Sequence, residues 1–156
     1  MAFGLKKYHR DECTERLRRF CLYRERCVKE CKDKLRSWGY FGSEADEIIN
    51  QLYAEKFIDE GRFAESFARG KLNNNNWGKS KISWELKQKG ISSYNIENGI
   101  NSISEEEYEK KLLDLYKRKK NDYGGKGLNA FQLHQKISNF LVQKGFSYND
   151  INRLKQ

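Results

Sequence analysis

The side chains with the clearest chemical potential in this sequence are cations, because they occur in clusters and beside aromatic residues. Four stand in succession at residues 117–120, and Lys126 follows shortly after them. Further upstream, Lys79 and Lys81 come directly after Trp77. A lysine can bind a phosphate while a neighbouring ring stacks on a base, and such stacking contributes about 1–3 kcal/mol per base. These residues therefore predict contact with a polyanion such as nucleic acid.

The charge of the whole chain supports the same reading. Its 156 residues carry a net charge of +9, which is unevenly distributed. Residues 1–40 have twelve Lys/Arg and six Asp/Glu (+6), residues 41–105 have eight and ten (−2), and residues 106–156 have eleven and six (+5). Two basic ends thus flank a nearly neutral middle, and basic surfaces attract phosphate backbones. A simple solvated surface is the alternative explanation.

Structural explanations compete with the functional one at several positions. Cations in the last turn of a helix complement its dipole, but four in succession at residues 117–120 exceed what capping needs. For Trp77 we favour packing into the protein over base stacking. Trp84 lies opposite Ile82 and Leu86 on a helix, so it packs on a neighbouring unit or faces a partner. The arginines near residues 16–26 form either a second patch or a solvated helix face.

The cysteines and histidines do not make a metal or catalytic site by their spacing. Cys27 and Cys31 are separated by one helical turn, but Cys13 and Cys21 lack the paired spacing of a zinc site. Buried, reduced thiols are the favoured interpretation. We interpret His134 as a core or boundary residue. Nucleotide-binding loops, zinc-protease motifs and nucleophile elbows are missing, so we expect no enzyme, no cofactor and no metal.

A repeated segment indicates the elements that must position these side chains. The sequence KISWELKQKGIS begins at Lys81, and KISNFLVQKGFS, a close copy, begins at Lys136; a more distant copy begins at Lys34. Each copy has a leucine followed four residues later by a glycine. The leucines are Leu35, Leu86 and Leu141, and the glycines are Gly39, Gly90 and Gly145. Glycine in this position is typical of a helix end, because it adopts the left-handed conformation without strain.

A serine after each glycine can cap a following helix, namely Ser43, Ser92 or Ser93, and Ser147. Another helix precedes each leucine, as indicated by apolar residues spaced three and four apart. The chain is therefore predicted to be all-α, with three tandem three-helix repeats stacked into an elongated, curved array. The predicted units are residues 1–56, 57–104 and 105–156. Stacking enlarges the core that one small unit cannot provide alone.

At residues 57–92 the sequence resembles the RecX family of recombination regulators. The residues that carry the resemblance follow one another in the family's order and spacing: Asp59, Glu60, Arg62, Phe63, Ala64, Arg69, Trp77, Gly78, Ile82, Leu86, Lys89, Gly90 and Ile91. The segments ERCVKECKDKLRSWGY and KISNFLVQKGFS also resemble repeats of that family. The run of asparagines at residues 73–76 departs from the expected basic character.

The resemblance implies a cytoplasmic, monomeric regulator that binds the filament of RecA on single-stranded DNA and restrains its ATPase, strand exchange and coprotease activities. DNA binding without RecA is expected to be weak and nonspecific, and no membrane contact is expected. A helix-turn-helix protein that reads a duplex sequence is the alternative, although the acidic start of the helix near residue 44 disfavours it. The residues predicted to contact RecA or DNA are Arg24, Arg26, Arg62, Arg69, Lys71, Lys79, Lys81, Lys117, Arg118, Lys119, Lys120 and Lys126.

Overall fold

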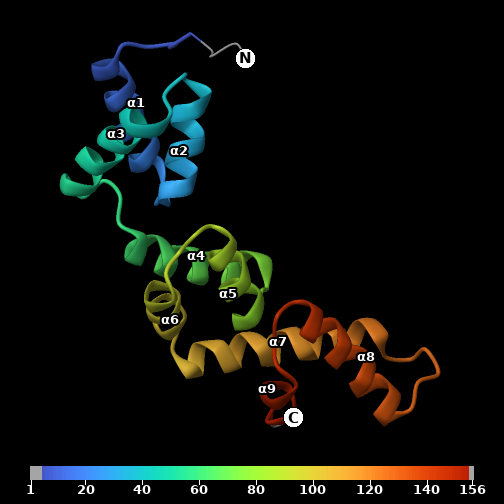
Figure 1. Cartoon of the computed structure of the whole chain (residues 1–156). Helices are drawn as coiled ribbons and strands as arrows, with labels where there is room; N and C mark the ends of the chain where they lie inside the picture. Colours follow the sequence, from blue (N-terminus) through green and yellow to red (C-terminus); the bar gives the residue numbers. More distant parts are fainter. Residues whose placement is uncertain (1–4, 155–156) are drawn as a thin grey trace.

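A computed structural model describes residues 5–154, and within that range the chain forms helices without any strand (Figure 1). The helices follow one another in three groups of three, which confirms the predicted all-α fold. In chain order they are α1 (Arg10–Tyr23), α2 (Val28–Ser37), α3 (Gly42–Ala54), α4 (Glu60–Asn75), α5 (Lys79–Gln88), α6 (Ser93–Asn101), α7 (Glu105–Tyr123), α8 (Ala130–Gln143) and α9 (Tyr148–Asn152).

We call α1–α3, α4–α6 and α7–α9 the first, middle and third units. Figure 1 shows them one after another along an elongated body, with the first unit at one end and the third unit at the other. The sequence boundaries at residues 56 and 104 remain a proposal, because the hydrophobic cores divide the molecule differently, as described below.

The turns within the units follow the predicted pattern. The repeated glycines Gly39, Gly90 and Gly145 have φ values of +88°, +78° and +105°, as the left-handed helix end requires. Ser92 accepts a hydrogen bond from the amide of Asn95 and so caps α6, and Ser147 caps α9 in the same way. The prediction for Ser43 was wrong. Helix α3 already begins at Gly42, so Ser43 lies inside its first turn and does not cap it.

The buried side chains form two hydrophobic clusters rather than three. One cluster belongs to the first unit and is built around residues such as Leu17, Leu35 and Leu52. The other runs without interruption through the middle and third units and also includes Cys27 of the first unit. The middle and third units therefore share one core, to which the first unit contributes the buried side chain of Cys27.

The junction between the middle and third units brings main chain against main chain. The amide of Gly78 donates to the carbonyl of Lys144 at 2.8 Å, and the amide of Ser80 donates to the carbonyl of Gly145 at 3.0 Å. The amide of Lys79 donates to the hydroxyl of Tyr108 at 3.0 Å. The start of α5 is thus capped by the third unit, and a Cβ atom on Gly78 would lie 2.4 Å from backbone atoms of Gly145.

The junction between the first and middle units has an equivalent plan with fewer main-chain contacts. Cys27 occupies the place of Gly78, since each residue immediately precedes the middle helix of its unit. The amide of Val28 donates to the carboxylate of Glu60 at 3.3 Å. This hydrogen bond corresponds to the one from the amide of Lys79 to the hydroxyl of Tyr108 at the other junction. The amide of Cys27 itself turns back to Glu30 of its own helix.

In the first and third units, main-chain groups that would face a further unit are hydrogen-bonded by residues of the same unit. Before α1, the amide of Lys7 donates to the carbonyl of Trp38 at 3.0 Å, and Leu5 and Lys6 lie against Gly39. The segment before α1 thus contacts the turn at Gly39 as Gly78 and Ser80 contact the equivalent turn at Gly145 of the third unit. At the other end, α8 begins with a capping box formed by Asn129 and Gln132 of its own chain segment.

Candidate polyanion-binding surface

A groove between the first and middle units brings three cations and two carboxylates together around three aromatic rings. We call it the inter-unit groove, and its lining residues are Arg24, Glu30, Phe63, Phe67, Lys71, Trp77, Glu85 and Lys89. An adjoining hollow continues it along α4 past Ser66, Gly70 and Asn74. Arg24 comes from the first unit, and the other cations come from α4 and the end of α5, so both units are needed to form it.

The aromatic rings hold the lysine ammonium groups of this groove in place. Phe67 and Trp77 lie 6.4 Å apart, centroid to centroid, in an edge-on arrangement. The Nζ atom of Lys71 lies 5.4 Å from the Phe67 ring and 4.9 Å from the Trp77 ring, and that of Lys81 lies 4.7 Å from Trp77. Each such cation–π contact contributes about 0.5–1 kcal/mol at an exposed site.

The prediction that Trp77 packs into the protein is confirmed, because its ring is partly buried against the core that contains Phe67. Since lysines already cover Trp77, the ring serves mainly to orient cations. The groove is consequently better suited to binding phosphate groups than to stacking bases.

Sequence reasoning missed two residues of the groove. Phe67 was not singled out, and Lys89 was named only among the residues that carry the family resemblance. The Nζ atom of Lys89 lies 5.8 Å from the centroid of the Phe67 ring. The spacing of Phe63, Phe67 and Lys71 by one helical turn each could have indicated that the three share a face of α4.

Six of the predicted contact residues form ion pairs or hydrogen bonds within the protein. Two of them are Arg24, which pairs with Glu30 at 3.0 Å, and Lys119, described below. Arg26 is buried, stacks on the Phe20 ring at 3.7 Å and donates to the Phe20 carbonyl at 2.9 Å, so we no longer count it as a contact residue.

The other three hold units together. Arg62 pairs with Glu25 of the first unit at 3.0 Å. Arg69 donates to Glu107 at 3.1 Å and to the carbonyl of Ser102 at 2.8 Å. Lys79 pairs with Glu105 of the third unit at 3.2 Å.

A second group of cations lies at the end of α7 and is separate from the groove. Lys117, Arg118 and Lys120 are exposed there, as is Lys126 in the following turn. Lys119 instead packs over the Phe140 ring at 4.1 Å and pairs with Asp122 at 3.6 Å. The structure therefore distributes the predicted cations over two separate surfaces.

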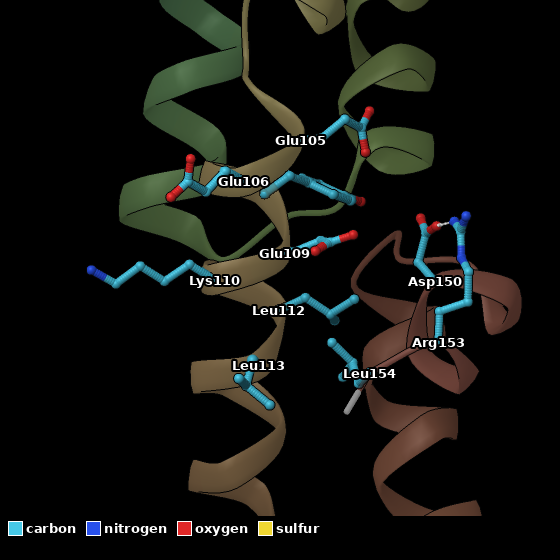
Figure 2. A pocket seen from close by; sticks show the side chains of 10 residues that line it. Glu105, Glu106, Glu109, Lys110, Leu112, Leu113, Asp150, Arg153 and Leu154 are labelled. Carbon is cyan, nitrogen blue, oxygen red and sulfur yellow. Dashed lines mark hydrogen bonds and ion pairs between the residues drawn. The ribbon is translucent and has the colours of Figure 1, made fainter. Parts of the chain in front are cut away.

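One hollow of the protein is acidic, so it is a poor site for a phosphate backbone. It measures about 670 Å³ and lies between α7 and α9 (Figure 2). Its four carboxylates and two cations are contributed by Glu105, Glu106, Glu109, Asp150, Lys110 and Arg153. Figure 2 shows Leu112 and Leu154 on opposite sides of it, and Asp150 is paired with Arg153. We therefore exclude this hollow from the polyanion-binding surface.

The remaining predictions concern single side chains. All four cysteines are buried and free, as predicted. His134 contacts the Tyr116 hydroxyl at 2.6 Å and Asn152 at 3.1 Å, so it belongs to a local hydrogen-bond network. Trp84 is 59% exposed, and the hollow beside it is lined by residues of its own unit.

Residues 5–154 contain neither a metal-binding cluster nor a membrane-spanning helix. No group of three or more His, Cys, Asp or Glu residues there is arranged to hold a metal ion. None of the helices has the length and apolar character that crossing a membrane demands.

Comparison with protein families gives two matches along the chain. Residues 59–100 match the family model described as RecX, second three-helix domain, and residues 105–154 match the one described as RecX, third three-helix domain. Together the two models cover more than half of the chain.

Individual relatives carry the same name. A protein named regulatory protein RecX from Clostridium botulinum (strain Eklund 17B / Type B) is 31% identical over 123 residues, which are 79% of this chain and 57% of the relative. Another of that name from Oceanobacillus iheyensis is 32% identical over 131 residues, 81% of this chain and 46% of the relative. The chain thus spans about half the length of these relatives.

Solved structures agree with the fold. The crystal structure of RecX from Lactobacillus salivarius superposes with a TM-score of 0.80 at 28% identity, and the match covers 92% of each chain. A second crystal structure, of a regulatory protein RecX, also gives a TM-score of 0.80, but its 22% identity supports the fold alone.

Proposed function

The chain belongs to the RecX family of regulatory proteins, and from that premise we propose that it binds the RecA–single-stranded DNA filament and restrains RecA. The observation that carries the proposal is the match of successive family models to the middle and third units. We further propose that the protein acts in the cytoplasm as a monomer and regulates RecA without catalysing a reaction itself.

The shape of the molecule supports this proposal. Three units in a row form an elongated body, and a helical filament presents the same subunit many times along its length (Figure 1). One molecule that spans several RecA subunits adds up several weak contacts, so each contact can be modest while the whole binds well. We therefore expect restraint at less than one copy per RecA subunit.

The distribution of charge suggests how the DNA within the filament would be contacted. The inter-unit groove presents Lys71 and Lys89 on aromatic supports, and Lys81 lies over Trp77, one of the rings that line it. The end of α7 presents a second group of cations. Phosphate contacts of this kind do not read sequence. Binding to DNA alone should accordingly be weak, independent of sequence and reduced by salt.

The direct test is a titration of the protein onto preformed RecA filaments, with RecA from the same source and with ATP hydrolysis as the readout. Hydrolysis should fall at less than one copy of the protein per RecA subunit. Unchanged hydrolysis at a molar excess would rule out the filament proposal.

Charge variants then locate the DNA contacts. Replacing Lys71, Lys81 and Lys89 by Gln should weaken binding to single-stranded DNA and flatten its dependence on salt. Each lost phosphate contact lowers the slope of log affinity against log salt by about 0.7 for a single strand. A variant with Gln at Lys117, Arg118 and Lys120 tests the end of α7 in the same way.

Lys87→Gln is the matched control for the groove variant, since Lys87 is exposed on the same helix as Lys81 but lies outside the groove. It should leave the affinity and the salt slope nearly unchanged. If the groove and α7 variants bind as the control does, the cations chosen here are wrong while the filament proposal stands.

The same measurements distinguish the alternative of a sequence-reading protein. Helix α3 would have to present base-contacting side chains at its start, but Glu44 and Glu47 lie there and pair with Lys6 and Arg10. A duplex site bound far more tightly than random DNA would favour that alternative.

A further inference from the structure

Two of the buried thiols lie in contact with each other across the first unit. The Sγ atoms of Cys21, near the end of α1, and Cys31, on α2, are 3.8 Å apart. Cys31 is fully buried, whereas 7% of Cys21 is exposed, so Cys21 is the member of the pair nearer to solvent. Both thiols are reduced in this structure.

The surroundings of the pair make Cys21 the more reactive thiol. A hydrogen bond with Cys31 lowers the pKa of Cys21, and the nearby guanidinium of Arg26 acts in the same direction. The same hydrogen bond, together with burial, raises the pKa of Cys31. Burial raises the pKa of Cys13 and Cys27 to about 11. The thiolate is the nucleophilic form of cysteine, so Cys21 should react first.

We propose that Cys21 and Cys31 are a peroxide-reactive dithiol that oxidises to an intramolecular disulfide between α1 and α2. In the first step the Cys21 thiolate attacks one oxygen of hydrogen peroxide. An S–O bond forms, the O–O bond breaks, and the departing hydroxide takes up a proton to become water. Cys21 is now a sulfenic acid.

In the second step the sulfur of Cys31 attacks the sulfur of Cys21. The S–S bond forms, the S–O bond breaks, and the hydroxide leaves as water with the proton that Cys31 gives up. Overall, two thiols are oxidised by two electrons and one peroxide is reduced to two waters.

The position of the pair allows the bond and gives it a consequence. A disulfide is about 2.05 Å long, so the sulfurs must approach by about 1.8 Å. Cys21 is two residues from the end of α1 at Tyr23, where helices yield most easily. Residues 24–27, inside the closed loop, supply Arg24 to the inter-unit groove, Glu25 to Arg62 and Cys27 to the shared core. The disulfide therefore stiffens the loop between α1 and α2, through which the first unit contacts the middle unit.

The test uses the intact protein and hydrogen peroxide alone, so its outcome is independent of RecA. After a peroxide pulse, quenching and denaturation, thiol labelling should find two of the four cysteines protected. Peptide mapping should find Cys21 joined to Cys31, with the loss of two hydrogens from the mass. Hydrogen exchange of residues 22–30 should be slower in the oxidised protein.

Variants separate the two steps. Cys31→Ser should stop at the sulfenic acid of Cys21, which a dimedone probe captures, and Cys21→Ser should protect no thiol. Cys13→Ser, at another buried cysteine of α1, should oxidise as the unchanged protein does; circular dichroism checks that each variant is folded.

The proposal is overturned if a different pair is joined, if four thiols survive peroxide that oxidises a free cysteine peptide, or if Cys13→Ser abolishes the bond. Unchanged hydrogen exchange across residues 22–30 would overturn the stiffening of the junction.

Discussion

The two junctions of this array solve the same packing problem with different residues. Between the middle and third units, Gly78 lets the main chain approach so closely that two backbone hydrogen bonds form across the junction. Between the first and middle units, Cys27 stands in the same position, and its side chain enters the neighbouring core instead. The glycine junction is closed by main chain, and the cysteine junction leaves a cation-lined groove.

The presence of a side chain explains this difference. An ordinary Cβ contact is longer than 3.4 Å, and a Cβ atom on Gly78 would be 2.4 Å from both Gly145 C and Phe146 N. Any residue other than glycine must therefore hold the two units further apart. At the first junction Cys27 carries a side chain in this position, and a groove lined by Arg24, Lys71 and Lys89 lies between the two units.

Among substitutions at the two junctions, Gly78→Ala should lower the stability of the protein most. The added methyl group meets backbone rather than a movable side chain, so the free energy of unfolding should fall by about 3 kcal/mol. Urea denaturation measures it. Gly70→Ala is the control, because no atom lies within 4 Å of a Cβ there; in a helix it should stabilise by about 0.5–1 kcal/mol. Equal effects of the two changes would contradict the tight seam.

A smaller loss is expected from Cys27→Ala at the other junction. The substitution removes a buried sulfur but lets the units settle, so we expect a loss of about 1 kcal/mol in the free energy of unfolding. Thermal and urea unfolding report it. A loss as large as that of Gly78→Ala would mean that the first junction is as tightly packed as the second.

The two junctions should also differ in how their contribution to folding stability depends on pH. Burial raises the pKa of Glu60, which caps Val28, so its contribution to stability is full below the unfolded-state pKa of about 4.3 and is lost as the pH rises through the folded value. Glu60→Gln keeps an acceptor oxygen without this titration. The variant should gain stability relative to the unchanged protein as the pH rises from 4 to 7.

Tyr108 plays the same part at the second junction, and burial raises its pKa to about 12. Tyr108→Phe should therefore lower stability by a constant amount over the acidic range. A relative stability of Glu60→Gln that does not change with pH would show that the Glu60 carboxylate is not desolvated at the junction.

The smallest effects should come from the ion pairs across each junction. Arg62 and Arg69 keep 42% and 47% of their side chains exposed, so each pair contributes less than about 1 kcal/mol. Arg62→Ala and Arg69→Ala should have similar small effects on unfolding, and added salt should diminish both. A larger, salt-independent loss for Arg69→Ala would point to its hydrogen bond with Ser102.

Local signals were enough to predict the interior of each unit. The glycines Gly39, Gly90 and Gly145, and the serines Ser92 and Ser147, act on residues only a few positions away, so their roles are visible in short stretches of sequence. Ser43 failed as a cap because nothing in its neighbours shows that the helix begins one residue earlier.

The junctions could not be predicted in the same way. Gly78 meets Gly145 at a distance of 67 residues along the chain, and the sequence gives no sign of which main-chain atoms meet. The cations were found, but not their partners. Arg69 and Lys79 looked like DNA contacts because the glutamates that neutralise them belong to the next unit.

The ends of the array have an evolutionary consequence. A unit copied into the interior finds a neighbour on each side ready to cap its helices, as Tyr108 caps α5. A unit added before α1 would first have to displace the segment that already occupies the turn at Gly39, and one added after α9 would find α8 already capped by Asn129. Duplication would therefore lengthen such a protein from within more readily than from its ends, and excising the middle unit would remove Glu60, the acceptor for the amide of Val28 at the start of α2.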